Sequence, residues 1–140
     1  MKPTTLLALA LLLGCAGAST ETATSRTGGF RYVGRSQAGE PVLTGRIELA
    51  FPDDSTVTGS WVINWIPGAD TALEVGPQVG SGTLVGRRMG DSLLIEMNPS
   101  WADNNVALKA FPSADGYTGH WTWTAFAGPR SGGSFTIGHK

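Results

Sequence analysis

Few side chains of this chain are of a type that carries out reactions. The two histidines are His120, on the polar phase of a predicted strand, and His139, one residue from the end. Nucleophilic hydrolysis needs a base beside a nucleophile, and the chain contains no Gly-x-Ser-x-Gly elbow. We therefore predict that the protein is not an enzyme and has no catalytic residues.

The residue pattern also gives no support for a metal, a cofactor or a nucleic acid. His120 has no partner at the spacing of metal ligands, and Asp53-Asp54 is typical of a turn. The formal net charge is -1, from 10 basic and 11 acidic residues, and 15% of residues are charged. A nucleic-acid surface needs a basic stripe, so we expect no metal, no cofactor and no nucleic-acid partner.

The remaining candidates for binding chemistry are aromatic. Five rings fall on the predicted inward faces of strands: Trp61, Trp65, Trp121, Trp123 and Tyr117. They could form the wall of a cup for a small apolar ligand, with hydrogen bonds from the indole nitrogens and the Tyr117 hydroxyl. The alternative is that these rings fill the interior and leave no room for a ligand.

Trp101 is a large aromatic residue in the otherwise polar segment 99–105. Exposed tryptophans are favoured anchors at protein interfaces, so Trp101 is a candidate partner-binding residue. The alternative is that Trp101 folds over the interior as a lid.

These rings lie in short runs rich in Thr, Val, Ile and Trp. Each run is bounded by Gly, Pro, Asp, Asn or Ser. No run keeps a 3.6-residue period, which indicates an all-β chain. We predict eight strands, over residues 30–35, 42–51, 56–65, 80–87, 93–98, 106–111, 117–126 and 133–139.

Apolar and polar residues alternate in these strands, so each has one apolar face, as expected for antiparallel strands in consecutive hairpins. Gly45, Gly59, Gly82 and Gly119 lie on the apolar phase. A glycine at such a position lets a strand bend sharply, which is how a sheet closes. The sequence therefore favours a single up-and-down eight-stranded β-barrel, with a two-sheet sandwich as the alternative.

The predicted connections differ in length. Those after the second, fourth and sixth strands are short and rich in turn formers, whereas 66–79 and 99–105, after the third and fifth strands, are longer. In an up-and-down barrel the odd connections share one rim. We therefore expect one tight end, where the first strand begins, and one end that carries the long loops.

The first residues have the pattern of an export signal. A basic start at Lys2 precedes an apolar stretch of about eight residues, far below the ~20 residues that span a bilayer. Leu12-Leu13-Gly14-Cys15 resembles the lipobox of bacterial lipoproteins, although Leu13 is larger than the residue usual there. The resemblance implies a diacylglycerol on the Cys15 thiol, and Ala16 in place of aspartate implies the outer membrane. Ordinary cleavage after Ala18, which would release a soluble periplasmic or secreted protein, is the alternative.

Cys15 is the single cysteine, so no disulfide can stabilise the domain. The segment from Ala16 to Gly29 is small and polar, with no apolar period, as expected for a flexible tether. The predicted organisation is a signal peptide over 1–14, a lipidated cysteine and tether over 15–29, and one barrel domain over 30–140.

The strand count, the alternation and segments such as Tyr32-Val33-Gly34-Arg35 and Val42-Leu43-Thr44-Gly45-Arg46 resemble the calycin group of avidins and lipocalins. The likeness is architectural. The chain departs from the lipocalin pattern in one respect: lipocalins carry a Gly-x-Trp in their first strand, whereas Gly59-Ser60-Trp61 and Gly119-His120-Trp121 lie in predicted strands three and seven. No binding residue is carried over from either family.

We therefore expect a non-enzymatic cell-envelope lipoprotein, joined to the membrane through Cys15, that binds a small apolar ligand in the barrel or at its mouth. The alternatives are an interaction or inhibitor module that uses rim loops 66–79 and 99–105, and a passive structural role.

Overall fold

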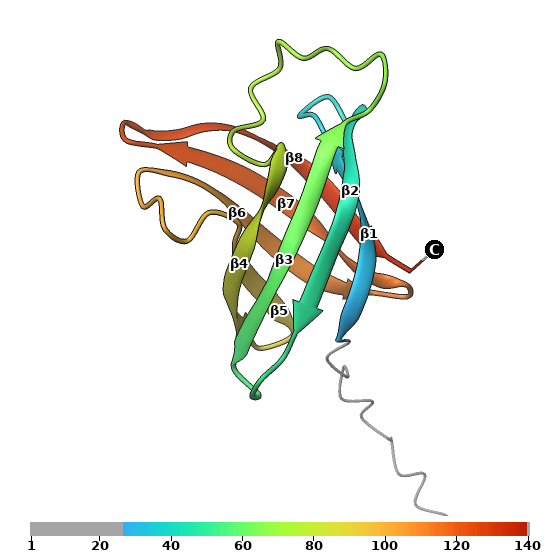
Figure 1. The fold of residues 1–140 in the computed structure, drawn as a ribbon, viewed down its shortest axis with the longest axis vertical. Coiled ribbons are helices and arrows are strands. Elements are labelled where there is room, and N and C mark those ends of the chain that lie inside the picture. The colour runs from blue at the N-terminus through green and yellow to red at the C-terminus, as the bar shows by residue number, and fades with distance from the viewer. Residues whose placement is uncertain (1–26, 140) are drawn as a thin grey trace, which may run out of the picture.

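Residues 27–139, which the computed structural model of the chain describes, form eight antiparallel strands. In chain order the strands are β1 (Gly28–Arg35), β2 (Pro41–Ala50), β3 (Thr56–Trp65), β4 (Gly80–Met89), β5 (Ser92–Glu96), β6 (Asn104–Ser113), β7 (Gly116–Ala125) and β8 (Gly128–Gly138). Each strand pairs with the next, and β1 also pairs with β8, which closes the barrel (Figure 1). The predicted eight-stranded meander barrel is confirmed. The predicted signal peptide, Cys15 and the tether up to residue 26 lie outside the described residues.

Most strand boundaries differ from the prediction by one or two residues, and the start of β8 differs by five. β1 begins at Gly28, inside the predicted tether, because Gly28 and Gly29 pair with Leu49 and Glu48 of β2. β8 begins at Gly128 rather than at residue 133, because 128–132 pair with the end of β7 across a tight turn. Main-chain hydrogen bonds to the neighbouring strand hold both extensions. Such bonds do not require alternating apolar side chains, so no sequence pattern marked these strand ends.

The alternating apolar residues point into the barrel and fill it. The residues in this core come from all eight strands and include Phe30, Tyr32, Leu43, Ile47, Trp61, Ile63, Leu84, Ile95, Met97, Leu108, Trp121, Phe135 and Ile137. Tyr32 and Phe135 stack with ring centroids 5.9 Å apart. Because no disulfide is possible, this burial is the main term that stabilises the domain.

The inward-facing glycines lie where neighbouring strands approach too closely for a side chain. A Cβ atom at Gly59 would overlap the carbonyl oxygen of Glu48, and one at Gly119 would overlap that of Lys109. Gly82 has a different role, because a Cβ atom there would lie 2.8 Å from Cζ2 of the Trp61 ring. Two of these glycines therefore permit the strands to curl, and Gly82 makes room for an indole.

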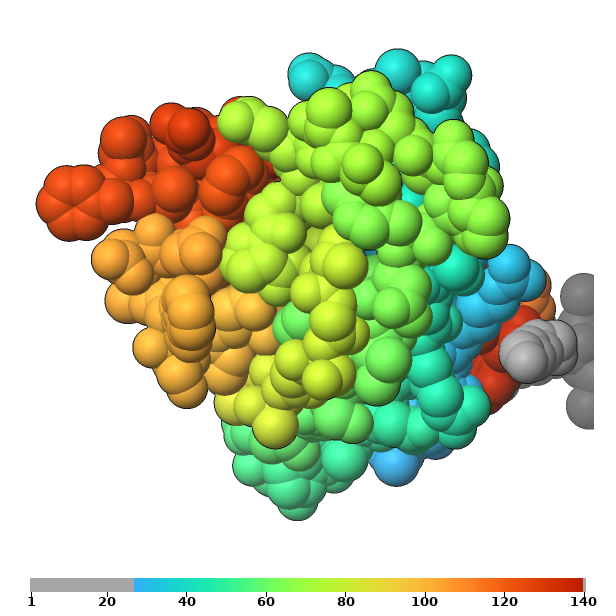
Figure 2. Space-filling model, turned by 45° about the horizontal axis from the view of Figure 1, so that its top comes forward, coloured from blue at the N-terminus to red at the C-terminus, as the bar shows by residue number. Residues whose placement is uncertain are grey.

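The two ends of the barrel differ as predicted. The connections at the tight end are 51–55, 90–91 and 114–115, and those at the loop end are 36–40, 66–79, 97–103 and 126–127. β1 begins at the tight end, far from loop 66–79 (Figure 1). Figure 2 shows loop 66–79, in green to yellow, lying across the loop end, with the orange segment near residue 100 and the red β7–β8 hairpin beside it.

Candidate functional site at the loop end

The five aromatic residues predicted to line a ligand cup differ in burial. Trp61, Trp121 and Tyr117 are buried in the core, whereas Trp65 and Trp123 are half-buried and pack against it. Tyr117 packs edge-on against Phe30, with ring centroids 6.4 Å apart. The cup prediction thus joined residues that lie in different parts of the barrel.

Three indole N–H groups are already used inside the fold. Trp61 donates to the Met97 carbonyl at 2.9 Å, and Trp121 donates to the Arg35 carbonyl at 2.9 Å. Trp123 donates to Oδ1 of Asn104 at 2.7 Å. A ligand that used these donors would first have to break an existing hydrogen bond, and a buried group left unpaired costs ~1–3 kcal/mol.

Loop 66–79 closes the loop end with a buried polar contact. Gln78 is buried; its Oε1 accepts a hydrogen bond from the Tyr32 hydroxyl at 2.9 Å, and its Nε2 donates to the Val75 carbonyl at 2.6 Å. Burial raises the pKa of Tyr32 far above its usual value near 10. The sequence did not indicate this contact, because a lone glutamine in a loop has no pattern that marks it as buried.

Trp101 is 60% exposed. It does not act as the lid that the sequence left open as an alternative, because Val75 and Gln78 of loop 66–79 close the barrel instead. The backbone around Trp101 is held in turns: its N–H donates to the Asn98 carbonyl at 3.0 Å, and its own carbonyl accepts from the Asn104 N–H at 3.2 Å. Trp101 is thus an exposed ring on an ordered loop.

Asn98 fixes that loop to its surroundings. Its Nδ2 donates to the Pro77 carbonyl at 2.9 Å, and its Oδ1 accepts from the Val106 N–H at 3.2 Å. The Asn98 N–H in turn donates to Oδ1 of Asn105 at 2.9 Å. These bonds replace a strand ladder at the point where β5 ends, and they tie the loop that carries Trp101 to loop 66–79.

A groove of about 290 Å³ lies between β4 and the Trp101 loop. One side is the start of β4 with Val79, and the other is the segment from Met97 to Trp101. Trp61 also lines the groove; its ring, which lies under Gly82, is only 4% exposed. The groove therefore combines an ordered apolar base with an exposed aromatic ring on one side.

A second hollow, of about 440 Å³, lies between loop 66–79 and the ends of β3 and β7. Trp65 and Trp123, two of the predicted cup residues, line it together. The Trp123 ring lies against Gly76, and the Arg130 guanidinium is 5.9 Å from its centroid. Contacts with Gly76 and Asn104 thus join this ring to loop 66–79 and to β6.

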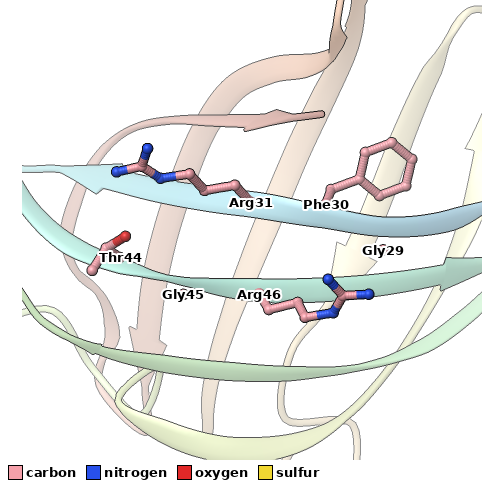
Figure 3. A pocket seen from close by; sticks show the side chains of 6 residues that line it. All are labelled: Gly29, Phe30, Arg31, Thr44, Gly45 and Arg46. Carbon is pink, nitrogen blue, oxygen red and sulfur yellow. The ribbon is translucent and has the colours of Figure 1, made fainter. Parts of the chain in front are cut away.

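The outer wall of β1 and β2 carries a further hollow, of about 510 Å³, beside two arginines (Figure 3). Arg31 and Arg46 are directly opposite each other in the ladder, and Arg46 forms an ion pair with Glu48. Figure 3 shows their guanidinium groups extending in opposite directions along the strands. The two groups do not converge on a common point, so the pair is not arranged to bind one anion.

The titratable groups that the sequence dismissed lie apart from these hollows. His120 is exposed on β7, and the ring of His139 packs on Phe30 with centroids 4.6 Å apart. Oδ1 of Asp53 accepts hydrogen bonds from the backbone N–H groups of Ser55 and Thr56. Among residues 27–139, no three His, Cys, Asp or Glu side chains are grouped to hold a metal ion. The same part of the chain has no helix with the length and apolar character to cross a membrane.

No protein-family model, no curated protein and no solved structure gives a significant match to this chain. Its own residues therefore carry the functional argument.

Proposed function

We propose that this chain is an exported, non-enzymatic envelope protein that binds a partner through the loop end of its barrel, at the groove beside Trp101. The observation that carries the proposal is the 60% exposure of Trp101 on a loop fixed by Asn98, beside a hollow lined by Trp61 and Met97. A large exposed aromatic residue on an ordered surface is a characteristic interface anchor. An exposed indole ring that meets no partner keeps its apolar surface in contact with water, which is unfavourable.

The packing of the barrel favours a binding site at the rim over one in the interior. A ligand within the barrel would have to displace Trp61 and Trp121 and break both of their bonds to backbone carbonyls. It would also have to open loop 66–79 against the buried contact between Tyr32 and Gln78. The groove beside Trp101 requires neither change, so we place binding there.

The proposed location follows from the export signal and the orientation of the barrel. A lipid on Cys15 would join the membrane, through the segment that precedes β1, to the tight end, where β1 begins. The loop end would then face away from that membrane, free to meet a partner in the envelope or beyond it.

Photo-crosslinking in the native cell tests the proposal. A photoreactive amino acid replaces Ser100, which lines the groove, and in a matched control it replaces His120, which is exposed on the outer face of β7. We expect a discrete adduct from position 100 and none from position 120, and mass spectrometry of the recovered protein should show an acylated Cys15 at its N-terminus. Equal labelling at both positions, or none at either, would contradict binding at the groove.

Fatty acids and small aromatic compounds provide the opposite test. If they shift the tryptophan fluorescence of the purified protein and Trp61→Ala abolishes the shift in a folded variant, the interior cup is the correct function. We expect no such shift.

A further inference from the structure

The groove beside Trp101 coincides with an interruption in the barrel wall. β4 pairs with β3 along Gly80–Arg87, but it pairs with β5 only from Val85 to Met89. β5 ends at Glu96, and the chain then turns through 97–103 instead of continuing along β4. The first half of β4 is therefore an edge strand within an otherwise closed barrel.

The backbone groups that face this edge can be identified from the ladder. N–H and C=O groups of successive residues in a strand point to opposite edges. The Arg88 N–H donates to the Ser55 carbonyl, on the β3 side, at 2.8 Å, so the even-numbered residues of β4 face β3. Ser81 and Thr83 therefore direct their N–H and C=O groups away from β3, toward the groove.

These four groups have the spacing of a β-ladder. In the other half of β4, the same phase pairs Val85 with Glu96 and Arg87 with Leu94 of β5. Ser81 and Thr83 continue that phase by two more positions, and they have no ladder partner on this side among the described residues. Backbone groups at an exposed edge are a template for another extended chain.

The side chains around the edge specify more than an extended backbone. Val79 and the Trp101 ring, both exposed, give the groove its apolar surface, and Met97 lies buried beneath it. In the segments 77–85 and 96–103 the charged side chains are Glu96 and Asp103, both carboxylates. An indole face also attracts a nearby cation. Both carboxylates are exposed beside the groove, Glu96 at the end of β5 and Asp103 two residues after Trp101, whereas Arg87 and Lys109 lie further along the wall, diagonal to Glu96. The carboxylates at the groove end of this wall therefore favour a basic ligand.

We propose that the open edge of β4 binds an extended, basic segment of another protein by strand addition. Alternate apolar side chains of that segment lie in the groove beside Trp101, and its lysine or arginine side chains lie near Glu96 and Asp103. The inference rests on the proposed function and specifies the class of partner. Main-chain bonds to Ser81 and Thr83 supply the alignment, and the apolar contact with Trp101 supplies most of the affinity.

A labelled heptapeptide of alternating valine and lysine, acetylated and amidated at its ends, tests the inference by fluorescence anisotropy with the full chain. We expect saturable binding, and binding at least about tenfold weaker to Trp101→Ala. The matched control is Phe126→Ala, because Phe126 is the other large exposed ring at this end and lies on the β7–β8 turn, outside the groove. A peptide with glutamate in place of lysine should bind at least about tenfold more weakly than the lysine peptide.

Two further comparisons separate strand addition from side-chain contact alone. Thr83→Pro removes an N–H that β3 does not use, and Thr83→Ala keeps it, so only the proline variant should weaken binding. If the proline variant does not fold, two N-methylated peptides make the same test. One is methylated at every valine nitrogen and the other at every lysine nitrogen. Because only one of these two sets of N–H groups faces β4, one peptide should lose binding and the other should keep it. Peptide binding should also slow hydrogen exchange at the Ser81 and Thr83 amides.

Several results would overturn the inference. These are the absence of binding at millimolar peptide, equal binding of the glutamate peptide, or indifference to both N-methylated forms. Self-association of the full chain that Thr83→Pro abolishes would identify a second copy as the occupant instead. A crosslink at position 100 in the cell without peptide binding would leave the proposed function intact and exclude strand addition, so the two failures are distinguishable.

Discussion

The Tyr32→Phe substitution removes one oxygen atom from the contact that holds loop 66–79 in the barrel. At pH 8 the variant leaves Oε1 of Gln78 buried without its 2.9 Å donor, and an unsatisfied buried acceptor costs ~1–3 kcal/mol. We therefore expect the free energy of unfolding to fall by about that amount.

The same substitution has an opposite effect on stability at alkaline pH. The pKa of Tyr32 lies near 10 in the unfolded chain and far above it in the folded protein, because burial disfavours the phenolate. Stability from the neutral phenol is therefore complete below pH 10 and is lost as the pH rises above it. By linkage the wild type loses on the order of 1 kcal/mol for each pH unit above 10. Phenylalanine cannot ionise, so the variant escapes this loss.

Urea unfolding followed by tryptophan fluorescence at pH 8 and pH 11 measures both terms. The difference in stability between wild type and variant should shrink by roughly 1 kcal/mol between the two pH values. Lysines and other groups that titrate in this range are common to both proteins and cancel in the difference. If the two proteins lose the same stability between pH 8 and pH 11, Tyr32 is not held neutral by burial, and the account of a closed barrel end is wrong.

Two other predictions concern the barrel wall and a turn. Gly59→Ala and Gly119→Ala should each lower the free energy of unfolding by ~1–3 kcal/mol or more, because the new Cβ would overlap the carbonyl oxygen of Glu48 or Lys109. Gly138→Ala, whose nearest contact would be at 3.8 Å, should be near neutral in the same thermal unfolding assay. Equal effects at all three positions would contradict the close strand approach. The hydrogen bonds from Thr56 and Ser55 lower the pKa of Asp53 to about 2, so Asp53 stabilises the turn above the unfolded pKa of 3.8 and loses that effect as the pH falls toward 2. Asp53→Asn should therefore lower the midpoint of thermal unfolding at pH 7 and change it less at pH 2, and an equal change at both would refute the assignment.

The fold could be predicted from the sequence to a large extent because its signals are local. The alternation in segments such as Val57 to Trp65 follows directly from the two faces of a strand, and the inward phase of Gly59 and Gly119 pointed to closure. The two longest loops could be assigned to one end because both follow odd-numbered strands of a meander. Strand ends at Gly28 and Gly128 were missed because hydrogen bonds to a neighbouring strand, rather than side chains, extend the strands there.

The candidate site was only partly predictable. Trp101 could be singled out as a large ring in a polar loop, but whether it would be a lid or an exposed anchor depended on loop 66–79. The proposed cup joined Trp61, Trp65 and Trp123 because they share a phase, and phase carries no information about depth along the barrel. The hydrogen bonds of their indole groups to Met97 and Asn104 join segments far apart in the chain.

The sequence by itself determined that this chain would curl into an eight-stranded barrel with an apolar interior, since alternation and inward glycines act within a single strand and its neighbour. Only the tertiary structure decided that Gln78 and Tyr32 close one end and that β4 extends past the end of β5 beside Trp101. Those features depend on where separate segments stop relative to one another in space. Register and loop packing set such positions, and neither is encoded in the residue pattern of one strand.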